Sequence, residues 1–515
     1  MKSTFFGLEI ARRGLMTQQT ALQTVSHNIA NANTPGYSRQ RVNFVQTEPY
    51  PAASLNRPQI PGQMGTGVEA GSIERVRDHF LDVQYRGENN KLGYWQTKQE
   101  ALKKMEEIMN EPSESGLSQT MDLFWQSLQD LAVNPMNPGA RSVVRQRGIA
   151  VAETFNYLSS SLNGVRQDLK NEIEVTEKQI NSLLQQIHQI NNQISDVEPH
   201  GYLPNDLYDE RDRLLDELSQ LVNIQVTYKK NDGNSKAIAE GKAIVKLVTD
   251  GMPGATLVDA LGYNKVTINF SGSSDTVNEI SVGSTVIRAD NFTYSGKLRG
   301  LIDSYGFEDG SGNVKGIYPN MLAELDSLAY TFAVRFNEQH EDGKSPNVID
   351  GTSTSVPPFF KDKENGTIDG TTPKEGFARR MAIADEILAD LNNIANADAS
   401  NPVHGDAQNI IKLANIIVSE KLNYRTYPST FKDYYESVIG DMAVQSQEAV
   451  RLSSNSNVLR EAVEQRRMSM SSVSLDEEMT NMIQFQHAYN AAARMITLQD
   501  ELLDRIINGM GTVGR

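Results

Sequence analysis

Both ends of this chain carry apolar residues at a seven-residue spacing, and this pattern constrains the possible fold more than any other feature. A heptad repeat held over three or more cycles is typical of a helix that pairs with another helix along one narrow face. We therefore expect a terminal coiled coil in which the first and last helices lie side by side. The repeat consists of Leu8, Leu15, Leu22 and Ile29 at one end, and of Met482, Tyr489, Ile496 and Leu503 at the other.

The same two segments lack charge over long stretches. Residues 14–38 and 479–493 contain no Asp, Glu, Lys or Arg, although a solvated amphipathic helix normally carries charges opposite its apolar face. Thr20 and Thr24 lie opposite the N-terminal repeat, so we expect this face to meet water in a free chain and to be buried among neighbours in an assembly. The alternative is a chance feature of a Gln-rich helix.

The charge-free N-terminal stretch ends in the sequence NIANANTPGY, residues 28–37. Asn and Ala are poor strand formers, and the preceding residues keep a helical period, so the stretch predicts the end of a helix. Pro35 and Gly36 then favour a turn.

The interior predicts a mainly α protein with inserted β structure. Apolar spacing indicates a long antiparallel helix bundle that includes a helical hairpin over residues 165–222, whereas residues 224–294 alternate Val, Ile, Thr and Tyr with polar residues between Asp-Gly and Ser-Gly turns. Four units are predicted: a terminal coiled-coil unit of 1–60 plus 466–515; a helical bundle of 61–223, 295–342 and 406–465; a β domain of 224–294; and a loop-rich or small β excursion of 343–405.

Composition excludes several classes of function. The net charge of −16 without clustered Lys or Arg argues against nucleic-acid and anionic-membrane partners, and no window is long and apolar enough for a membrane span. The chain has no cysteine, and its N-terminus lacks the apolar core of a cleaved signal peptide.

No pattern of catalytic, cofactor-binding or metal-ligating residues stands out. The seven histidines do not pair at ligand spacing on one helical face, and the sequence around Asp309 lacks the Gly and Glu of a calcium loop, so it predicts a turn. The acidic residues Asp209, Glu210 and Asp212 are interleaved with Arg211 and Arg213, which predicts ion pairs within a solvated helix. We therefore expect a protein that is not an enzyme and needs no cofactor or metal.

Both termini resemble those of the flagellar axial proteins, the family of rod, hook and hook-associated proteins. The resemblance lies in STFFGLEIARRGLMTQQTALQTVSHNIANANTPGYSRQRV near the start and in SLDEEMTNMIQFQHAYNAAARMITLQDELLDRII near the end. Three internal stretches are similar to the hook-associated members at the junction between hook and filament. These are EPSESGLSQTMDLFWQSLQDLAVNP, NDLYDERDRLLDELSQLVNIQV and SGKLRGLIDSYG.

This resemblance implies a structural adaptor that forms a ring between hook and filament. Its partners would be further copies of itself, the hook protein, a second junction protein and the flagellin filament. It would be made in the cytoplasm and secreted through the flagellar type III export system with a dedicated export chaperone.

The resemblance also assigns residues to these roles. The expected assembly interface comprises the eight heptad residues of the two ends together with Asn28, Asn31, Asn33, Pro35, Gly36 and Tyr37. The expected chaperone-binding segment comprises Leu475, Met482, Phe485, Tyr489, Ile496 and Leu502.

Two alternatives remain open. Another axial protein, such as a hook or distal rod protein, would share the termini but would not be expected to carry the helical hairpin. A peptidase domain inserted into an axial protein would need a catalytic motif in residues 224–405, and none is evident.

Overall fold

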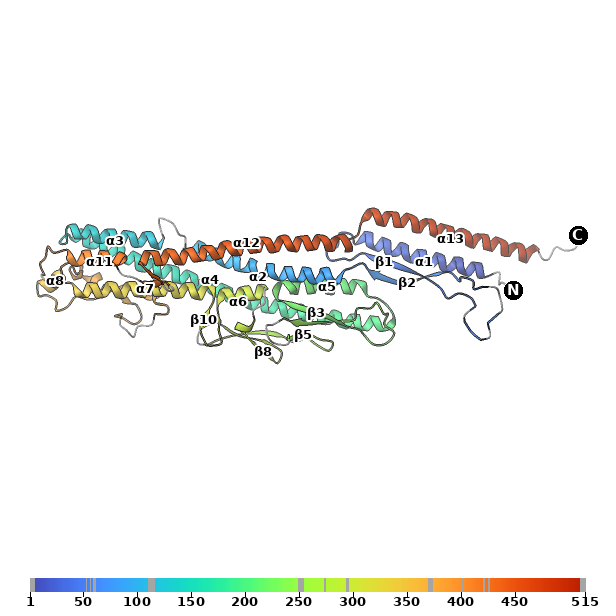
Figure 1. The fold of residues 1–515 in the computed structure, drawn as a ribbon, viewed down its shortest axis with the longest axis horizontal. Helices are drawn as coiled ribbons and strands as arrows, with labels where there is room; N and C mark the ends of the chain where they lie inside the picture. The colour runs from blue at the N-terminus through green and yellow to red at the C-terminus, as the bar shows by residue number, and fades with distance from the viewer. Residues whose placement is uncertain are drawn as a thin grey trace.

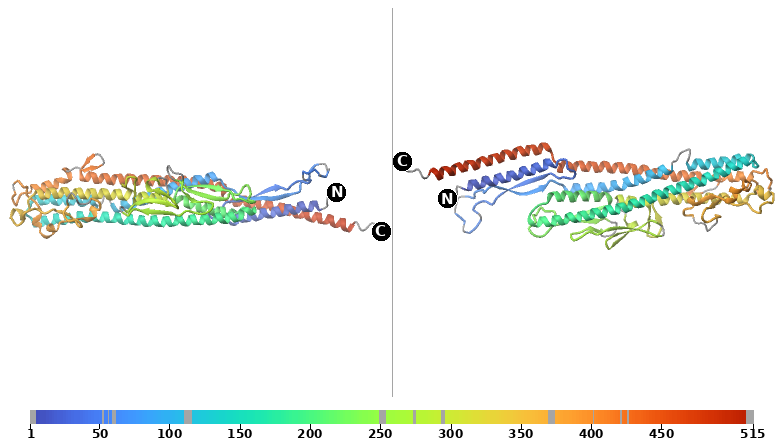
Figure 2. Two further views of the ribbon diagram at one scale, coloured as in Figure 1. Left: turned by 90° about the horizontal axis from the view of Figure 1, so that it is seen from below. Right: turned by 180° about the vertical axis from the view of Figure 1, so that it is seen from behind.

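The computed structural model describes residues 5–51, 53–55, 57–58, 62–109, 116–248, 254–272, 275–292, 296–368, 374–400, 402–419, 422–424 and 427–509. The molecule is elongated, and both chain ends lie at the same tip (Figure 1). The first and last helices project beyond the remaining structure, and further views show the same arrangement from below and behind (Figure 2). We call the projecting part, residues 5–75 and 475–509, the terminal arm, and residues 79–471 the body.

The terminal arm contains two helices and a β-hairpin. Helix α1 (Phe6–Ala30) runs antiparallel to α13 (Leu475–Gly509), because Gly7 lies beside Gln499 and Asn28 beside Glu478. Strands β1 (Gln40–Gln46) and β2 (Val68–Arg75) form an antiparallel pair that packs against α1. The terminal helices thus lie side by side, as the heptad repeats predict.

The body is built from long helices. They are α2 (His79–Met109), α3 (Leu117–Val133), α4 (Pro138–Val197), α5 (Asn205–Leu221), α6 (Lys297–Tyr305), α7 (Ile317–Asp342), α11 (Gln408–Ser419) and α12 (Phe431–Ser471). Asn137 caps the start of α4 by accepting a hydrogen bond from the Gly139 N–H at 2.8 Å, and Pro138 occupies the first helical position, where its missing N–H costs nothing. The chain then turns at η1 (Glu198–His200) and Gly201, and α5 packs back along α4. The predicted helical hairpin is therefore present.

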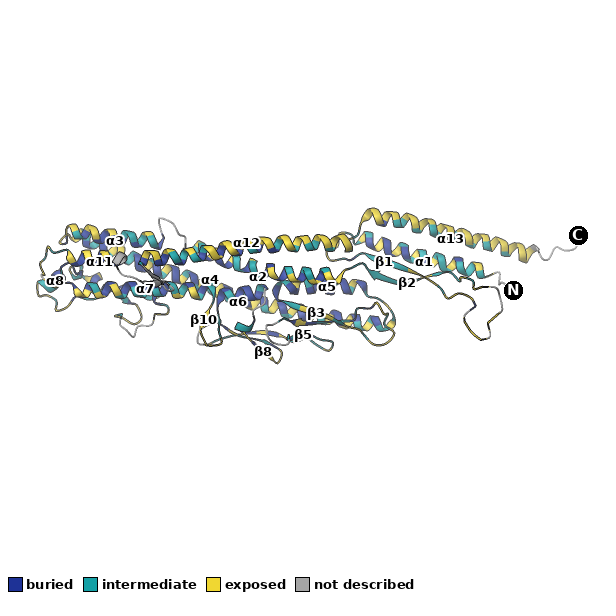
Figure 3. Ribbon diagram, viewed as in Figure 1, coloured by how far each residue is buried: buried dark blue, intermediate teal, exposed yellow. Residues whose placement is uncertain are grey.

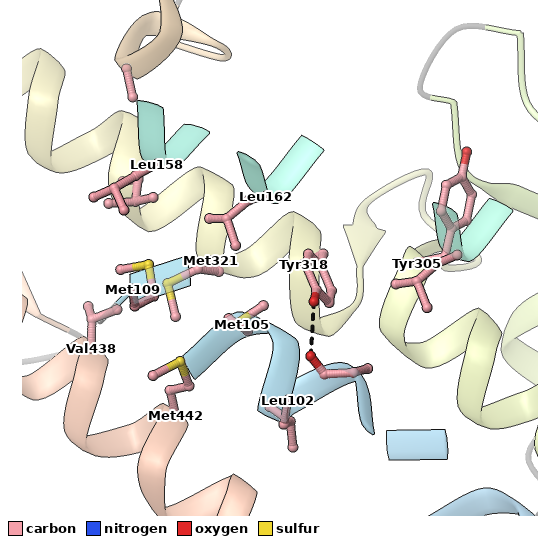
Figure 4. Packing of buried hydrophobic residues seen from close by; sticks show 14 of the residues in the cluster. Leu102, Met105, Met109, Leu158, Leu162, Tyr305, Tyr318, Met321, Val438 and Met442 are labelled. Carbon is pink, nitrogen blue, oxygen red and sulfur yellow. Dashed lines mark hydrogen bonds between the residues drawn. The ribbon is translucent and has the colours of Figure 1, made fainter. Parts of the chain in front are cut away.

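The core of the body lies where α2, α4, α6, α7 and α12 meet (Figure 4). It contains Met105 and Met109 of α2, Met321 of α7 and Met442 of α12, and the Tyr318 hydroxyl donates to the backbone oxygen of Ala101 at 2.9 Å. An aromatic cluster extends this core towards α3, with Phe124 and Phe336 rings 5.4 Å apart. These side chains remove a large apolar area from water, which is the main stabilising term for such a bundle.

The predicted β region lies along one side of α4 (Figure 1). One sheet contains β3 (Ile224–Lys229), β4 (Lys242–Leu247) and β5 (Thr256–Val258); another contains β6 (Val266–Phe270), β7 (Val277–Val282), β8 (Thr285–Arg288), β9 (Phe307–Glu308) and β10 (Val314–Lys315). Asn191 and Asn181 of α4 each bond both the backbone N–H and C=O of one strand residue, Ala243 and Val266 respectively. The predicted turn at Asp309 joins β9 to β10.

The described part of residues 343–405 packs on the helices, mainly on α4 and α7. They include α8 (Pro346–Ile349), β11 (Phe360–Asp362), α9 (Phe377–Arg380), β12 (Met381–Ile383), α10 (Asp385–Ala389) and η3 (Leu391–Asn393). A further short pair, β13 (Leu422–Tyr424) and β14 (Tyr427–Ser429), precedes α12. Phe359 and Phe360 insert into the aromatic cluster, and Asn337 of α7 fixes their backbone through three hydrogen bonds.

Candidate functional site: the joint between terminal arm and body

The end of NIANANTPGY forms a hydrogen-bonded centre inside the arm. The Asn28 side chain is 1% exposed; its oxygen accepts from the Gln40 N–H at 3.0 Å and from the Tyr37 hydroxyl at 2.8 Å. Its amide nitrogen donates to the Gln40 carbonyl at 2.8 Å and to Glu478 of α13 at 3.1 Å. Asn28 thus ties α1, the loop after it, β1 and α13 together, and it uses all its bonding capacity within the chain.

Tyr37 and Glu478 both bond to Asn28 in this centre. Burial, reinforced by the nearby carboxylates of Asp206 and Asp209, raises the pKa of the Tyr37 hydroxyl, which stays protonated and donates to Asn28. The Glu478 side chain is 2% exposed and accepts from the Arg39 Nε–H at 2.8 Å. A buried carboxylate is tolerated here because it is paired and hydrogen-bonded.

A second cluster, rich in charge, joins the arm to the body. The Arg75 guanidinium at the end of β2 lies 2.7 Å from Asp209 and 3.0 Å from Asp212, both on α5, and 2.5 Å from Glu240. Arg77 binds Asp82 through two hydrogen bonds, of 2.8 and 2.9 Å. We call the full set the arginine–aspartate cluster; it comprises Arg75, Arg77, Asp82, Arg86, Asp209, Arg211, Asp212, Asp216, Glu240 and Arg467.

The cluster continues into the body through Arg86 of α2 and Arg467 of α12. Arg86 lies 2.8 Å from Asp216 and 3.2 Å from Asp212, and Arg467 lies 2.5 Å from Asp216. The cluster contains five arginines and five carboxylates, and Arg467 also pairs with the half-buried Glu464 at 2.9 Å. The end of β2, the crossing after it, α2, α5, the loop before β4 and α12 therefore meet at one buried, ion-paired site.

Burial and ion pairing shift the pKa values of these groups in opposite directions. Desolvation alone would raise the pKa of Asp212, but the guanidiniums of Arg77, Arg75 and Arg86 outweigh it and hold that pKa well below its usual range. Desolvation would lower the pKa of Arg86, but Asp216 and Asp212 raise it instead. Asp209 differs, because desolvation outweighs Arg75 and the Ser38 N–H and raises its pKa.

The prediction of solvated ion pairs within α5 is therefore confirmed for some of its residues and wrong for the others. Glu210, Arg213 and Glu217 do pair with one another at the surface. Asp209, Arg211 and Asp212 are instead buried and bind residues far away in the sequence. The missed signal is the spacing of Asp209, Asp212 and Asp216, which follow the i, i+3, i+7 pattern of a buried helix face.

The expected assembly residues divide into two groups. Asn28 is buried and Asn31 and Tyr37 are half-buried in the joint, whereas Asn33, Pro35 and Gly36 are exposed. The heptad residues of α1 and α13 are all half-buried. They are Leu8, Leu15, Leu22 and Ile29, with Met482, Tyr489, Ile496 and Leu503.

The face of α1 opposite its heptad repeat is covered by the chain itself. Thr17, Thr24 and Asn28 are buried, and Thr17 donates to the backbone oxygen of Val68 in β2 at 3.1 Å. The expectation that Thr24 meets water in a free chain is therefore wrong. The uncharged polar side chains suit this position because they bond to the hairpin backbone without burying charge.

The expected chaperone-binding residues also lie on more than one face. Leu475 and Leu502 are exposed, at 49% and 46%. Met482, Phe485, Tyr489 and Ile496 are half-buried, and the Phe485 ring meets the Phe44 ring of β1 edge-on at 5.8 Å.

Comparison with known proteins identifies the family. The flagellar hook-associated protein 1 of Bacillus subtilis is 46% identical over 518 aligned residues, and the match covers all of both chains. This chain belongs to the flagellar hook-associated protein 1 family. The protein of that name from Salmonella typhimurium is 24% identical over 97% of this chain and 98% of its own length.

Family models divide the chain consistently with this assignment. The helical domain of the flagellar hook-associated protein FlgK matches residues 102–353, the C-terminal domain of flagellar basal body rod FlgEFG proteins matches 464–509, and the flagella basal body rod protein family matches 8–37. The flagellar hook junction protein FlgK from Burkholderia pseudomallei has a similar fold. It aligns with a TM-score of 0.58 at 15% identity, over 76% of this chain and all of its own.

The hook proteins that were found match a small part of this chain. The flagellar hook protein FlgE of Borreliella burgdorferi is 33% identical over 82 residues, 15% of this chain. The resemblance seen in the sequence is thereby confirmed for the hook-associated family, whose members are structural flagellar proteins and not enzymes. Among the described residues, no helix is long and apolar enough to cross a membrane.

Proposed function

We propose that this protein is the adaptor that joins the flagellar hook to the filament, assembled as a ring of identical subunits through its terminal arms. The observation that carries the proposal is the uncovered apolar surface of α13. Among its residues 475–508, only Glu478 is buried (Figure 3). Its exposed apolar side chains include Leu475, Met479, Ile483, Met495, Leu498, Leu502, Ile506 and Ile507.

This surface favours burial against other proteins. Met479 and Ile483 are 52% and 56% exposed, and both belong to the charge-free stretch 479–493. A helix with apolar residues outside its packed face is stabilised by further burial, and the missing charges lower the cost of excluding water. Neighbouring copies, the hook protein, a second junction protein and the filament are the partners that the family resemblance implies.

The export chaperone would bind the same helix before assembly. The proposed chaperone residues Met482, Tyr489 and Ile496 are half-buried on a helix that contacts α1, so the chaperone and α1 would compete for this helix. We propose that the chaperone holds α13 apart from α1 until the chain enters the flagellar type III export system, and that the arm closes after secretion. The proposed destination is the junction of hook and filament outside the cell.

The domain division also remains a proposal. Because β2 pairs with β1 and packs on α1, we place the inner boundary of the terminal unit after Arg75, not after residue 60. On the C-terminal side α12 continues to Ser471, and the extended backbone of Ser472 ends it before α13 begins.

The test uses a Bacillus subtilis strain that lacks its own hook-associated protein 1. We expect the wild-type chain to restore filaments and Ile483→Glu to leave hooks bare, because every subunit would bury a carboxylate at a cost of several kcal/mol. The matched control is Val175→Glu on α4 of the body, where the side chain is 61% exposed.

Both variants should melt like the wild-type monomer, since both positions meet water in the free chain. If Ile483→Glu supports filaments as well as Val175→Glu does, the exposed face of α13 is not an assembly surface. If the wild-type chain itself fails to restore filaments while being exported, the proposed adaptor role is wrong.

A further inference from the structure

The arm is joined to the body through a small set of contacts beside two chain crossings. The chain passes from β2 to α2 at residues 76–78 and from α12 to α13 at 472–474, and neither segment is helical. Ser472 has extended backbone angles, φ −75° and ψ 157°, so the long C-terminal helix is broken where the arm begins. Two non-helical crossings at one level have the geometry of a hinge.

Arg75 is the arm's main polar anchor at this hinge. Its side chain is only 3% exposed and reaches three carboxylates of the body, from Asp209, Asp212 and Glu240. Other hydrogen bonds also cross the joint: the Ser38 N–H donates to Asp209 at 2.9 Å, Gln40 donates to Asp206 at 2.9 Å, and Lys236 donates to the Gly71 carbonyl at 2.7 Å. Asn205 donates to the Ile73 carbonyl at 3.0 Å, and the Arg39 N–H donates to the Ser471 carbonyl at 2.8 Å. Among these contacts, Arg75 alone brings one guanidinium against three carboxylates.

Each acid of the socket has a second arginine within the cluster. Asp212 also binds Arg86 at 3.2 Å, and Asp209 lies 3.7 Å from Arg77. Glu240 also binds Arg211. Withdrawing Arg75 would therefore leave every carboxylate with a cationic partner, which limits the penalty for unpaired buried charge.

Open space lies on both sides of the loop that the arm presents to the joint. A groove of about 280 Å³ lies between Thr34, Tyr37 and residues of α5 that include Asp206 and Arg213. A second groove of about 570 Å³ lies between the same loop and α2, α5 and α12. The loop 34–37 is thus bordered by open space on two sides.

We propose that Arg75 and its socket form a latch that holds the terminal arm at one angle to the body, and that the arm pivots about residues 76–78 and 472–474 when the latch opens. The inference extends the proposed function, since neighbours that bind the arm would select its angle during assembly. The latch is nevertheless a property of the isolated chain and is tested without any partner.

The test exploits the absence of cysteine. Spin labels are placed at Gln19→Cys on α1 and Lys178→Cys on α4, both exposed positions, and the distance distribution between them is measured by pulsed electron resonance in the full chain. A second pair, Lys91→Cys with Lys178→Cys, reports on the body alone. We expect a single narrow peak from both pairs in the otherwise wild-type chain.

Arg75→Met should open the latch. The arm–body distribution should broaden at least twofold or gain a second peak, and the body pair should stay narrow. The matched control is Arg86→Met, an equally buried arginine of the same cluster whose carboxylate partners Asp212 and Asp216 both belong to the body. It should lower the melting temperature while leaving the arm–body peak narrow.

Arg75→Lys provides the test if Arg75→Met does not fold. A single ammonium keeps the charge but cannot bridge three carboxylates, so an intermediate broadening is expected with the body pair unchanged. The latch is refuted if the folded Arg75 variant keeps the wild-type arm–body peak, or if Arg86→Met broadens that peak equally. Because the readout is a distance in the monomer, its failure would not bear on filament growth.

Discussion

The body and the terminal arm are both helical, but they bury their apolar residues to very different degrees. In the body, Phe124, Phe332 and Phe336 have no exposed surface. In the arm, Ile483 and Ile507 remain 56% and 72% exposed, although similar apolar spacing generates both regions. The body therefore contains its own core, whereas the arm leaves apolar surface uncovered, which the proposed assembly would bury.

The largest expected effect comes from truncating one phenylalanine in each region. Phe336→Ala should lower the free energy of unfolding by about 3–5 kcal/mol, because it opens a cavity in the aromatic cluster. Phe485→Ala in α13 should change it by less than about 1 kcal/mol, because the ring is only half-buried against Phe44. The measurement is chemical denaturation followed by tryptophan fluorescence.

Both tryptophans, Trp95 on α2 and Trp125 on α3, lie in the body, so the signal reports that region. If Phe336→Ala and Phe485→Ala shifted the transition equally, arm and body would unfold as one unit, and the proposed difference in their burial would be wrong.

The next expected effect is a dependence of stability on pH, which arises from a histidine in the buried core of the body. His340 is fully buried; its Nδ1 faces the Pro357 carbonyl at 3.0 Å, and its Nε2 accepts from the Ala395 N–H at 3.0 Å. Burial lowers the pKa of His340 to about 4, so the folded chain keeps the ring neutral while the unfolded chain protonates it below about 6.5.

The unfolded state therefore binds more protons between these values, and stability falls as pH drops from 6.5 to 4, by about 3 kcal/mol from this residue. The check is the same denaturation at pH 7 and pH 4.5, in wild type and in His340→Gln. The variant should lose less stability on acidification than the wild type does. His200→Gln, at an exposed position, should respond to pH as the wild type does.

The helices and their order follow from the sequence because their signals are local. Heptad spacing predicts α1 and α13, and the alternation of β-branched and polar residues predicts the sheets beside α4. The joint is different, because Arg75 lies 134 residues from Asp209 and 137 from Asp212. Spacing along α5 cannot distinguish a carboxylate that pairs with its own helix from one that pairs across the fold.

Residues 343–405 show the same limit. Their Gly, Pro and Asp content predicts loops, and several turns are present, but the packing of Phe359 and Phe360 depends on Asn337 and Phe336, on a helix about 20 residues earlier. Arg141 adds a further anchor from α4, donating to the carbonyls of Leu391 and Ile394. Such tertiary contacts have no local signature.

The smallest expected effect is confined to the arm. It tests whether the polar face of α1 is buried by the β-hairpin of the same chain or only by neighbouring proteins. Thr24 of α1 is 7% exposed on the face that packs against the β-hairpin, so Thr24→Glu should bury a charge and destabilise the arm by about 2 kcal/mol. Gln23→Glu, one residue away and exposed, should change arm stability by only a few tenths. The readout is amide hydrogen exchange of α1 and β2 in the monomer.

Thr24→Glu should accelerate exchange in both elements, while the tryptophan transition of the body stays in place, because the hairpin backbone that accepts the Thr17 hydroxyl packs on the same helix face. Thr24→Val, which keeps the shape without the hydroxyl, should leave the hairpin protected. If Thr24→Glu and Gln23→Glu give the same exchange rates, the hairpin does not cover α1 in solution. The polar face of α1 would then be part of the surface that neighbours bury in the proposed assembly, together with the exposed face of α13.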